Sequence, residues 1–176
     1  MVKKENHMFW QRIKNTGIFN VDGLFHMMRD YLISQDFEFH EVSVKHKVPS
    51  SAGWEEEYEW RATKKINEYI KFEVKVFMHL YNIREIEVVK EGKKQTLHQG
   101  SIEIWLRPTV IMDYEQRFAG NAFLIALQDW FHEYVWKHEL DDIWEDEVYY
   151  RCLKFHRAIK EYLDFETKTN ASEDRW

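Results

Sequence analysis

The chain has 176 residues, a formal net charge of −6 and a single cysteine. This length suits one domain with a full core, and the negative charge argues against a nucleic-acid partner, because phosphate binding needs a clustered basic face. One cysteine excludes an intrachain disulfide and fits a reducing compartment, so we expect a cytoplasmic protein. A membrane partner is also disfavoured, because no run approaches the ~18 apolar residues of a spanning helix.

The first 36 residues divide into an arm and a helix. Residues 1–19 show no regular apolar period, so we expect a loosely attached arm that Phe9, Trp10 and Ile13 pin to the body. From residue 20 onward, apolar residues recur at helical spacing, and Asn20 or Asp22 can cap the first turn. The expected core stripe comprises Val21, Leu24, Phe25, Met28, Tyr31 and Leu32.

A long β region follows, with a clear turn at residues 49–53. Segments 37–48 and 54–65 alternate apolar with polar residues, and the strongest signal is the strand predicted at 68–81. One of its faces is apolar throughout, whereas the other changes from charged residues to Phe77, His79 and Tyr81. That end of the strand is therefore expected to be covered on both sides. Residues 84–110 predict a hairpin that turns at 91–94, and Pro108 should weaken or end its second strand.

Two helices are predicted to complete the chain. The first carries a stripe of Phe123, Leu127, Trp130 and Tyr134. The second begins near residue 141 and runs to about 165, before a polar tail at 167–176. Its predicted apolar stripe comprises Trp144, Val148, Cys152, Phe155, Ile159, Tyr162 and Leu163. We therefore predict an α+β fold with an N-terminal helix, an antiparallel meander of about five strands, and two C-terminal helices packed on one sheet face. Residues 20–166 are expected to form a single domain.

The aromatic residues give the leading functional hypothesis. Aromatics make up 16% of the chain, which is enough for a core and an interface. Phe77, His79 and Tyr81, together with Trp105 on the next strand, are candidates for an apolar surface that binds a partner. The predicted function is a non-catalytic binding or interaction protein, a homo-oligomer or a partner of another protein.

A second hypothesis places a small apolar ligand in a pocket beneath the helices. Its candidate lining is Tyr58, Trp60, Phe72, Trp130 and Tyr134, because apolar pockets with few polar groups bind such ligands. The long meander followed by an amphipathic helix resembles, in outline, helix-grip (START-like) domains, although the predicted order has no strand before the first helix. This alternative includes weak hydrolase or cyclase chemistry in the pocket.

Motifs for catalysis and cofactors are missing from the sequence. It contains no G-x-G-x-x-G, P-loop, G-x-S-x-G or C-x-x-C, so we expect no cofactor and favour a protein that is not an enzyme. Cys152 and His156 are weak metal candidates, because residues at i and i+4 share one helix face. Cys152 lies in an apolar stripe, however, where a free cysteine acts as a small hydrophobic residue.

Overall fold

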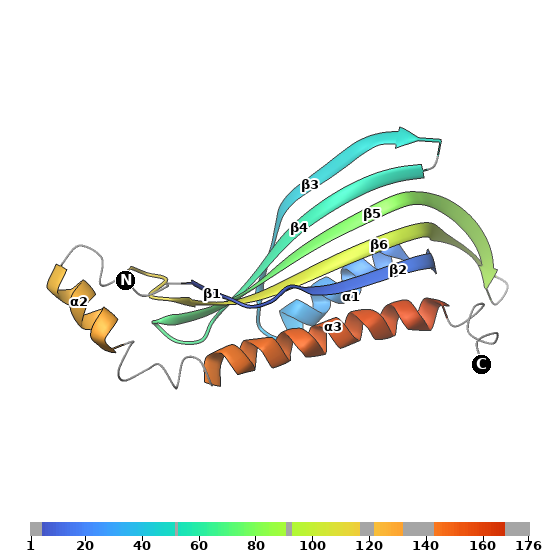
Figure 1. The fold of residues 1–176 in the computed structure, drawn as a ribbon. Coiled ribbons are helices and arrows are strands. Elements are labelled where there is room, and N and C mark those ends of the chain that lie inside the picture. Colours follow the sequence, from blue (N-terminus) through green and yellow to red (C-terminus); the bar gives the residue numbers. More distant parts are fainter. Residues whose placement is uncertain (1–4, 52, 91–92, 117–121, 132–142, 168–176) are drawn as a thin grey trace.

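The computed structural model describes residues 5–51, 53–90, 93–116, 122–131 and 143–167. Its elements are β1 (Glu5–His7), β2 (Gln11–Phe19), α1 (Val21–Ser34), β3 (Glu38–Ser50), β4 (Gly53–Lys65), β5 (Ile70–Lys90), β6 (Lys93–Met112), α2 (Ala122–Phe131) and α3 (Asp146–Thr167). The predicted fold class is confirmed: the chain is α+β, with an N-terminal helix, a mostly meandering antiparallel sheet and C-terminal helices that pack on it (Figure 1).

The sheet has the order β1-β6-β5-β4-β3 across the described residues, and β2 continues β1 along the same edge of β6. Every strand pair is antiparallel. The helices α1 and α3 lie along one side of the sheet (Figure 1). We call the opposite side the open face.

The core lies between the sheet and these two helices. Alternate residues of β5 point toward the helices, and those from Phe72 to Leu80 are at most 2% exposed. The first helix contributes Leu24, Met28 and Leu32, and α3 contributes the predicted stripe of Val148, Cys152, Phe155, Ile159 and Leu163. Asn20 caps α1, as predicted, because its side chain accepts a hydrogen bond from the N–H of Gly23.

The N-terminal segment belongs to the sheet, which corrects the expectation of a loose arm at residues 1–19. Its strands β1 and β2 both pair with β6, and the break between them lies beside Pro108. Met8 N donates to Pro108 O at 3.1 Å, so the backbone of Pro108 faces the N-terminal segment. In an antiparallel pair the N–H and C=O of one residue point to the same neighbour. Because proline has no N–H, one hydrogen bond from β6 to the N-terminal segment is missing at this position. The break leaves Phe9 and Trp10 exposed by 90% and 44%. Six strands result, compared with about five predicted.

The strand β5 is also longer than predicted, because it continues through the expected loop after residue 81. A bulge separates Tyr81 from Arg84; Asn82 adopts a φ of 52° there, and Ile83 is fully buried. The sheet curves strongly beyond this point (Figure 1). The predicted turn at 91–94 agrees with the ends of β5 and β6, although residues 91–92 lie outside the described part of the chain.

The helix α2 lies beyond the end of the sheet, next to the start of β5 (Figure 1). Gln128 donates a hydrogen bond to Tyr69 Oη at 2.7 Å. Three members of its predicted core stripe, Phe123, Leu127 and Trp130, are exposed by 70%, 40% and 52%. The fourth, Tyr134, lies outside the described residues, as do positions 168–176 of the predicted tail.

Candidate functional site: the open face of the sheet

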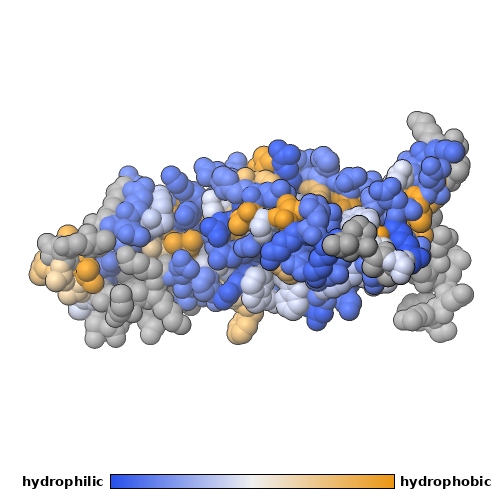
Figure 2. Space-filling model, turned by 90° about the horizontal axis from the view of Figure 1, so that it is seen from above, coloured by the Kyte–Doolittle hydropathy of each residue, from blue (hydrophilic) through white to orange (hydrophobic). Residues whose placement is uncertain are grey.

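Side chains on the open face form rows that cross the strands. Paired residues on neighbouring antiparallel strands point to the same side of a sheet, so the register fixes the members of each row. They are the basic row of Arg107, Lys75 and Arg61, the central row of Trp105, Phe77 and Glu59, and the acidic row of Glu103, His79 and Glu57. Aromatic groups thus lie between cations on one side and carboxylates on the other. Figure 2 shows this face as largely hydrophilic with hydrophobic patches along its middle.

The four residues predicted as an interface lie together here. Phe77 pairs with Trp105 across β5 and β6, and the His79 ring lies between those of Phe77 and Tyr81, at 6.4 and 3.7 Å. All four are half-buried, because their flanking charged side chains cover part of each ring. Their side chains are therefore accessible from the side of the sheet that α1 and α3 leave uncovered.

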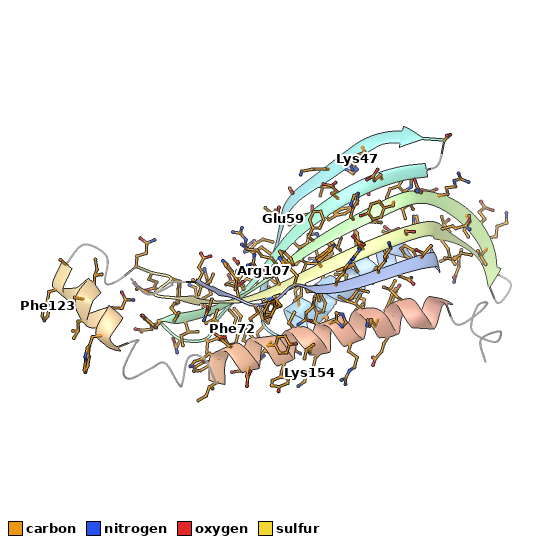
Figure 3. The ribbon with its side chains drawn as sticks, in the orientation of Figure 1. Lys47, Glu59, Phe72, Arg107, Phe123 and Lys154 are labelled. Carbon is orange, nitrogen blue, oxygen red and sulfur yellow. The ribbon has the colours of Figure 1, made fainter. Side chains whose placement is uncertain are left out.

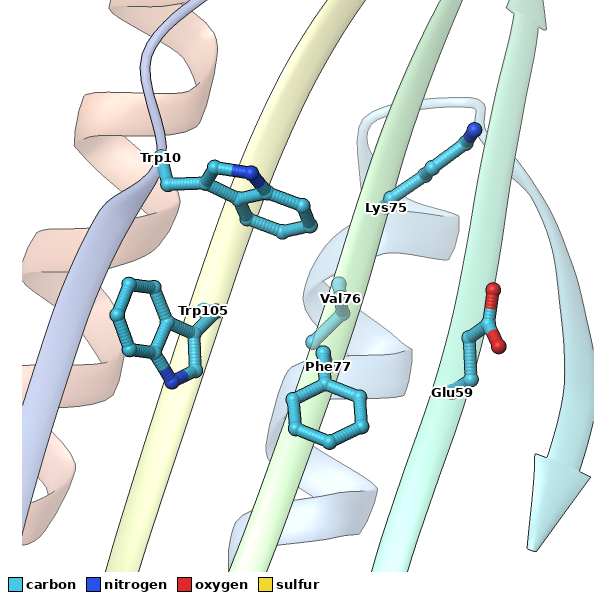
Figure 4. Close-up of a pocket in the computed structure, with 6 residues that line it drawn as sticks. All are labelled: Trp10, Glu59, Lys75, Val76, Phe77 and Trp105. Atoms are coloured by element: carbon cyan, nitrogen blue, oxygen red, sulfur yellow. The ribbon is translucent and has the colours of Figure 1, made fainter.

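Trp10 adds a further ring to this aromatic group, although it lies in the break between β1 and β2 and pairs with no strand residue. That break lies beside Pro108, and the Trp10 ring meets that of Trp105 edge to face, with centroids 6.4 Å apart. Together with Phe77 these rings border a depression of about 460 Å³, whose lining also includes Val76, Lys75 and Glu59 (Figure 4). We call this depression the Trp pocket. The rings make it apolar on one side, whereas Lys75 and Glu59 are charged.

The basic row adjoins the Trp pocket. Arg107 lies with its guanidinium carbon 5.3 Å from the Trp10 ring centroid, which is cation–π geometry. Glu73 forms ion pairs with the other two cations of the row, because its carboxylate oxygens lie 3.4 Å from Arg61 Nε and 3.5 Å from Lys75 Nζ. The row therefore carries more positive charge than its own ion pairs neutralise. Figure 3 labels Arg107 and Glu59 on this side of the sheet, and Phe72 between sheet and α3.

The acidic row is closely hydrogen-bonded. Glu103 accepts from Arg12, with Nε at 3.1 Å, and this bond holds the pKa of Glu103 below its usual value. Tyr81 Oη and Trp105 Nε1 each donate to the same carboxylate at 3.4 Å. Burial raises the pKa of Tyr81, and the Glu103 charge adds to this effect. Glu103 thus ties β2, β5 and β6 together on the open face.

A histidine and two carboxylates form the best metal-ligand geometry in the described part of the chain. Oxygen and nitrogen atoms of Glu55, Glu57 and His79 lie within 4.8 Å of one another. Lys47 already occupies this group, because its Nζ lies 2.6 Å from Glu55 and 3.3 Å from Glu57. The hydrogen bond from Lys47 lowers the pKa of Glu55. Lys47 thus holds the place between the two carboxylates that a metal cation would take, and the arrangement is an ion-pair network.

The predicted ligand pocket beneath the helices is filled by its own side chains where the structure describes it. Trp60 and Phe72 are 3% and 0% exposed, and the Phe25 ring packs against Tyr58 and Trp60, with centroids 4.7 and 5.2 Å away. Trp130 lies on α2, away from this cluster (Figure 1). Tyr134 lies outside the described residues. Tyr58 and Trp60 thus pack together against Phe25, and Phe72 lies elsewhere in the same core beside Trp144, with ring centroids 6.2 Å apart.

The weak metal candidates on α3 lie in different surroundings. Cys152 is 1% exposed, and burial raises the pKa of its thiol to about 12, so the thiolate that binds metal is disfavoured. His156, one turn on, is half-buried, and burial lowers its pKa. Neither residue belongs to the metal-ligand group found among the described residues.

Several residues of this site were not predicted as site residues, among them Trp10, Lys75, Arg107 and Glu59. Lys75 and Arg107 alternate with the predicted residues Phe77 and Trp105 on the same strands, so alternation alone could have placed them on the open face. Trp10 depends on the strand break beside Pro108. That break follows from the pairing of β1 and β2, which the sequence pattern did not reveal.

No protein-family model matches the chain, and the search of curated proteins found no match either. In the described residues, no helix is long and apolar enough to cross a membrane.

Proposed function

We propose that the protein is a non-catalytic interaction protein that forms a homodimer through the open face of its sheet. The observation that carries this proposal is the aromatic central row, left uncovered by both packed helices and flanked by a basic and an acidic row. Most homodimers are isologous, so that one patch must complement itself. A surface with opposite charges on two sides of an aromatic centre meets that requirement.

The charge pattern indicates one orientation for the pair. If a two-fold axis lies between the faces and runs across the strands along the central row, the order of the rows is reversed in the partner. The basic row of one copy then faces the acidic row of the other, with Arg107 opposite Glu103 and Arg61 opposite Glu57. Phe77 and Trp105 meet their counterparts at the centre, where aromatic residues contribute most to interface energy.

The size of the face is sufficient for this role. Five strands at about 4.8 Å spacing, and about 27 Å from Tyr81 to Glu73, give roughly 650 Å² per partner. Stable interfaces bury roughly 600 to 1,000 Å² on each side. The predicted ligand pocket beneath the helices has less support, because Phe25, Trp60 and Phe72 fill that space with their own rings.

Sedimentation velocity of the purified full chain between 1 and 100 µM tests the proposal. The expected result is a concentration-dependent dimer, which Phe77→Asp converts to a monomer by placing a charge at the centre. Ile33→Asp, at a 46% exposed position of α1 on the other side of the molecule, should leave the dimer unchanged. Circular dichroism verifies that both variants fold. A monomer at every concentration, or equal dissociation by both variants, would overturn the proposal.

A further inference from the structure

The Trp pocket has the dimensions and the chemistry of a small-molecule site. Its volume of about 460 Å³ falls within the roughly 300–1,000 Å³ that ligand sites occupy. Trp10, Trp105 and Phe77 offer ring faces and edges on which a flat apolar group can pack (Figure 4). Ring stacking alone, however, would accept any aromatic molecule, so the class of ligand depends on the charged groups around the rings.

Those groups favour an anion at one end of the pocket. Lys75 lines it, and Arg107, the residue paired with Lys75 on β6, lies over the Trp10 ring with its guanidinium carbon 5.3 Å from the ring centroid. Arg107 Nε is shielded from solvent, and across the described residues no acceptor lies within hydrogen-bond distance of it. Buried N–H groups normally have partners, so a donor in this position is suited to an acceptor supplied by a ligand. The single carboxylate of Glu73 is shared by Lys75 and Arg61, which leaves the basic row with a positive excess.

Glu59 restricts how such a ligand can lie. Its carboxylate is on β4 next to Phe77, at the side of the pocket remote from the two tryptophans (Figure 4). A second negative group would be repelled there. The register places Lys75 beside Arg107 in the basic row, so the anionic group lies toward that row and the ring lies along Trp10 and Phe77.

We propose that the Trp pocket binds a small monoanionic aromatic carboxylate, with the ring between Trp10 and Phe77 and the carboxylate beside Lys75 and Arg107. A guanidinium donates to a carboxylate with good geometry, and such charge-assisted bonds are stronger than neutral ones. This proposal goes beyond self-association and does not depend on it. If the open face does form the dimer, the ligand and the second copy compete for Phe77 and Trp105, and binding shifts the equilibrium toward the monomer.

Three probes with one ring and different charges test the assignment: indole-3-acetate, neutral indole-3-acetamide and cationic tryptamine. Isothermal titration calorimetry of the full chain is carried out at a protein concentration whose oligomeric state is known from sedimentation. Indole-3-acetate is expected to bind at one site per chain, at least tenfold more tightly than tryptamine. The titration is made at a concentration at which the chain is monomeric, where binding is expected whether or not the protein dimerises at higher concentration, so failure of the self-association proposal is recognised separately.

Variants identify the site. Arg107→Gln and Lys75→Gln should each weaken indole-3-acetate at least fivefold and leave indole-3-acetamide unchanged, whereas Trp10→Ala should weaken both. Lys45→Gln provides the matched control, because Lys45 is a 69% exposed cation on the same face, paired with Glu57 outside the pocket; it should change neither. Equal affinity for the three probes would mean a nonspecific apolar depression. That result, or binding of none, would overturn the proposal.

Discussion

Glu103 is the residue on which most open-face hydrogen bonds converge. Arg12, Tyr81 and Trp105 donate to it, and its carboxylate belongs to a residue only 8% exposed. A carboxylate that accepts from an arginine is stabilised in its charged form, so its pKa in the folded protein lies below the ordinary value of 4.5. Its contribution to stability therefore depends on pH, and the sign of this dependence follows from linkage.

The free energy of unfolding should decrease as the pH falls below 4.5. Above that value Glu103 is ionised in both the folded and the unfolded chain, and its full contribution is present. Below it the unfolded chain takes up a proton first, and the contribution is lost as the pH passes through the lower pKa of the folded state. Urea titrations of the wild type and Glu103→Gln at pH 3 to 7 measure the effect.

The two urea series should converge at low pH, because the variant lacks this titrating group. Glu87→Gln is the matched control, because the Glu87 side chain is 72% exposed, pairs with Lys94 and lies far along β5 from Glu103. It should retain the acid dependence of the wild type. A difference between wild type and Glu103→Gln that stays constant from pH 3 to 7 would contradict the assignment.

At the scale of the elements, the bulge in β5 determines where the sheet curves. Asn82 has a φ of 52°, a left-handed conformation that costs most side chains about 1–2 kcal/mol and that asparagine tolerates better. Two glycines make room for the bulge. A Cβ at Gly53 would approach Ile83 O to 2.6 Å, and one at Gly100 would approach Tyr81 O to 2.9 Å.

Asn82→Ala should lower the free energy of unfolding by about 1 kcal/mol, because alanine gains nothing locally to offset the left-handed backbone. Asn82→Gly should be neutral or slightly stabilising, since glycine adopts this φ readily. Thermal and urea unfolding of both variants measure the difference. A lower free energy of unfolding for Asn82→Ala than for Asn82→Gly would show that the left-handed backbone at residue 82 causes the loss. If the two variants were destabilised equally, loss of the asparagine side chain and not the φ angle would be responsible.

The sequence predicted the elements whose side chains follow a clear period. The apolar face of β5 and the stripe of α3 are confirmed by burial, because their inward positions are apolar without interruption. Strand β2 was missed for the opposite reason. Polar Gln11 and Asn15 occupy the same side as its inward residues Ile13 and Phe19, and side-chain atoms of both are buried without hydrogen-bond partners among the described residues. A strand with polar inward positions has no period that alternation can detect.

Long-range pairing accounts for the remaining differences at the candidate site. The grouping of Phe77, His79 and Tyr81 follows from parity along one strand, so the sequence could place them together. Trp10 reaches Trp105 only because Pro108 on β6 interrupts the neighbouring edge. The sequence predicted that Pro108 weakens or ends its own strand, whereas β6 continues through Pro108 to Met112 and the interruption lies between β1 and β2. The sequence did not show that the interrupted strand would be the partner, because strand order is not encoded in local pattern.

At the scale of the whole molecule, the proposed dimer makes one contact that should be unfavourable. With the two-fold axis along the central row, the Glu59 at the end of that row faces the Glu59 of the partner. Two unit charges near a protein surface repel by about 1 kcal/mol or more within several ångströms. The dimer would therefore be held by its aromatic centre and by the pairing of the basic and acidic rows, against this local repulsion.

Glu59→Gln should consequently strengthen the dimer, lowering its dissociation constant about fivefold, which corresponds to about 1 kcal/mol.

Salt should weaken the wild-type dimer. Raising the ionic strength from 0.05 to 0.5 M screens the attraction between the basic row of one copy and the acidic row of the other. Sedimentation of wild type, Glu59→Gln and the control Glu87→Gln at both salt concentrations measures these effects. One result would contradict the proposed orientation: Glu59→Gln leaves the dissociation constant unchanged while Phe77→Asp still abolishes the dimer. The open face would then remain the interface, but the two-fold axis would not run along the central row, because an axis along that row brings the two Glu59 carboxylates together.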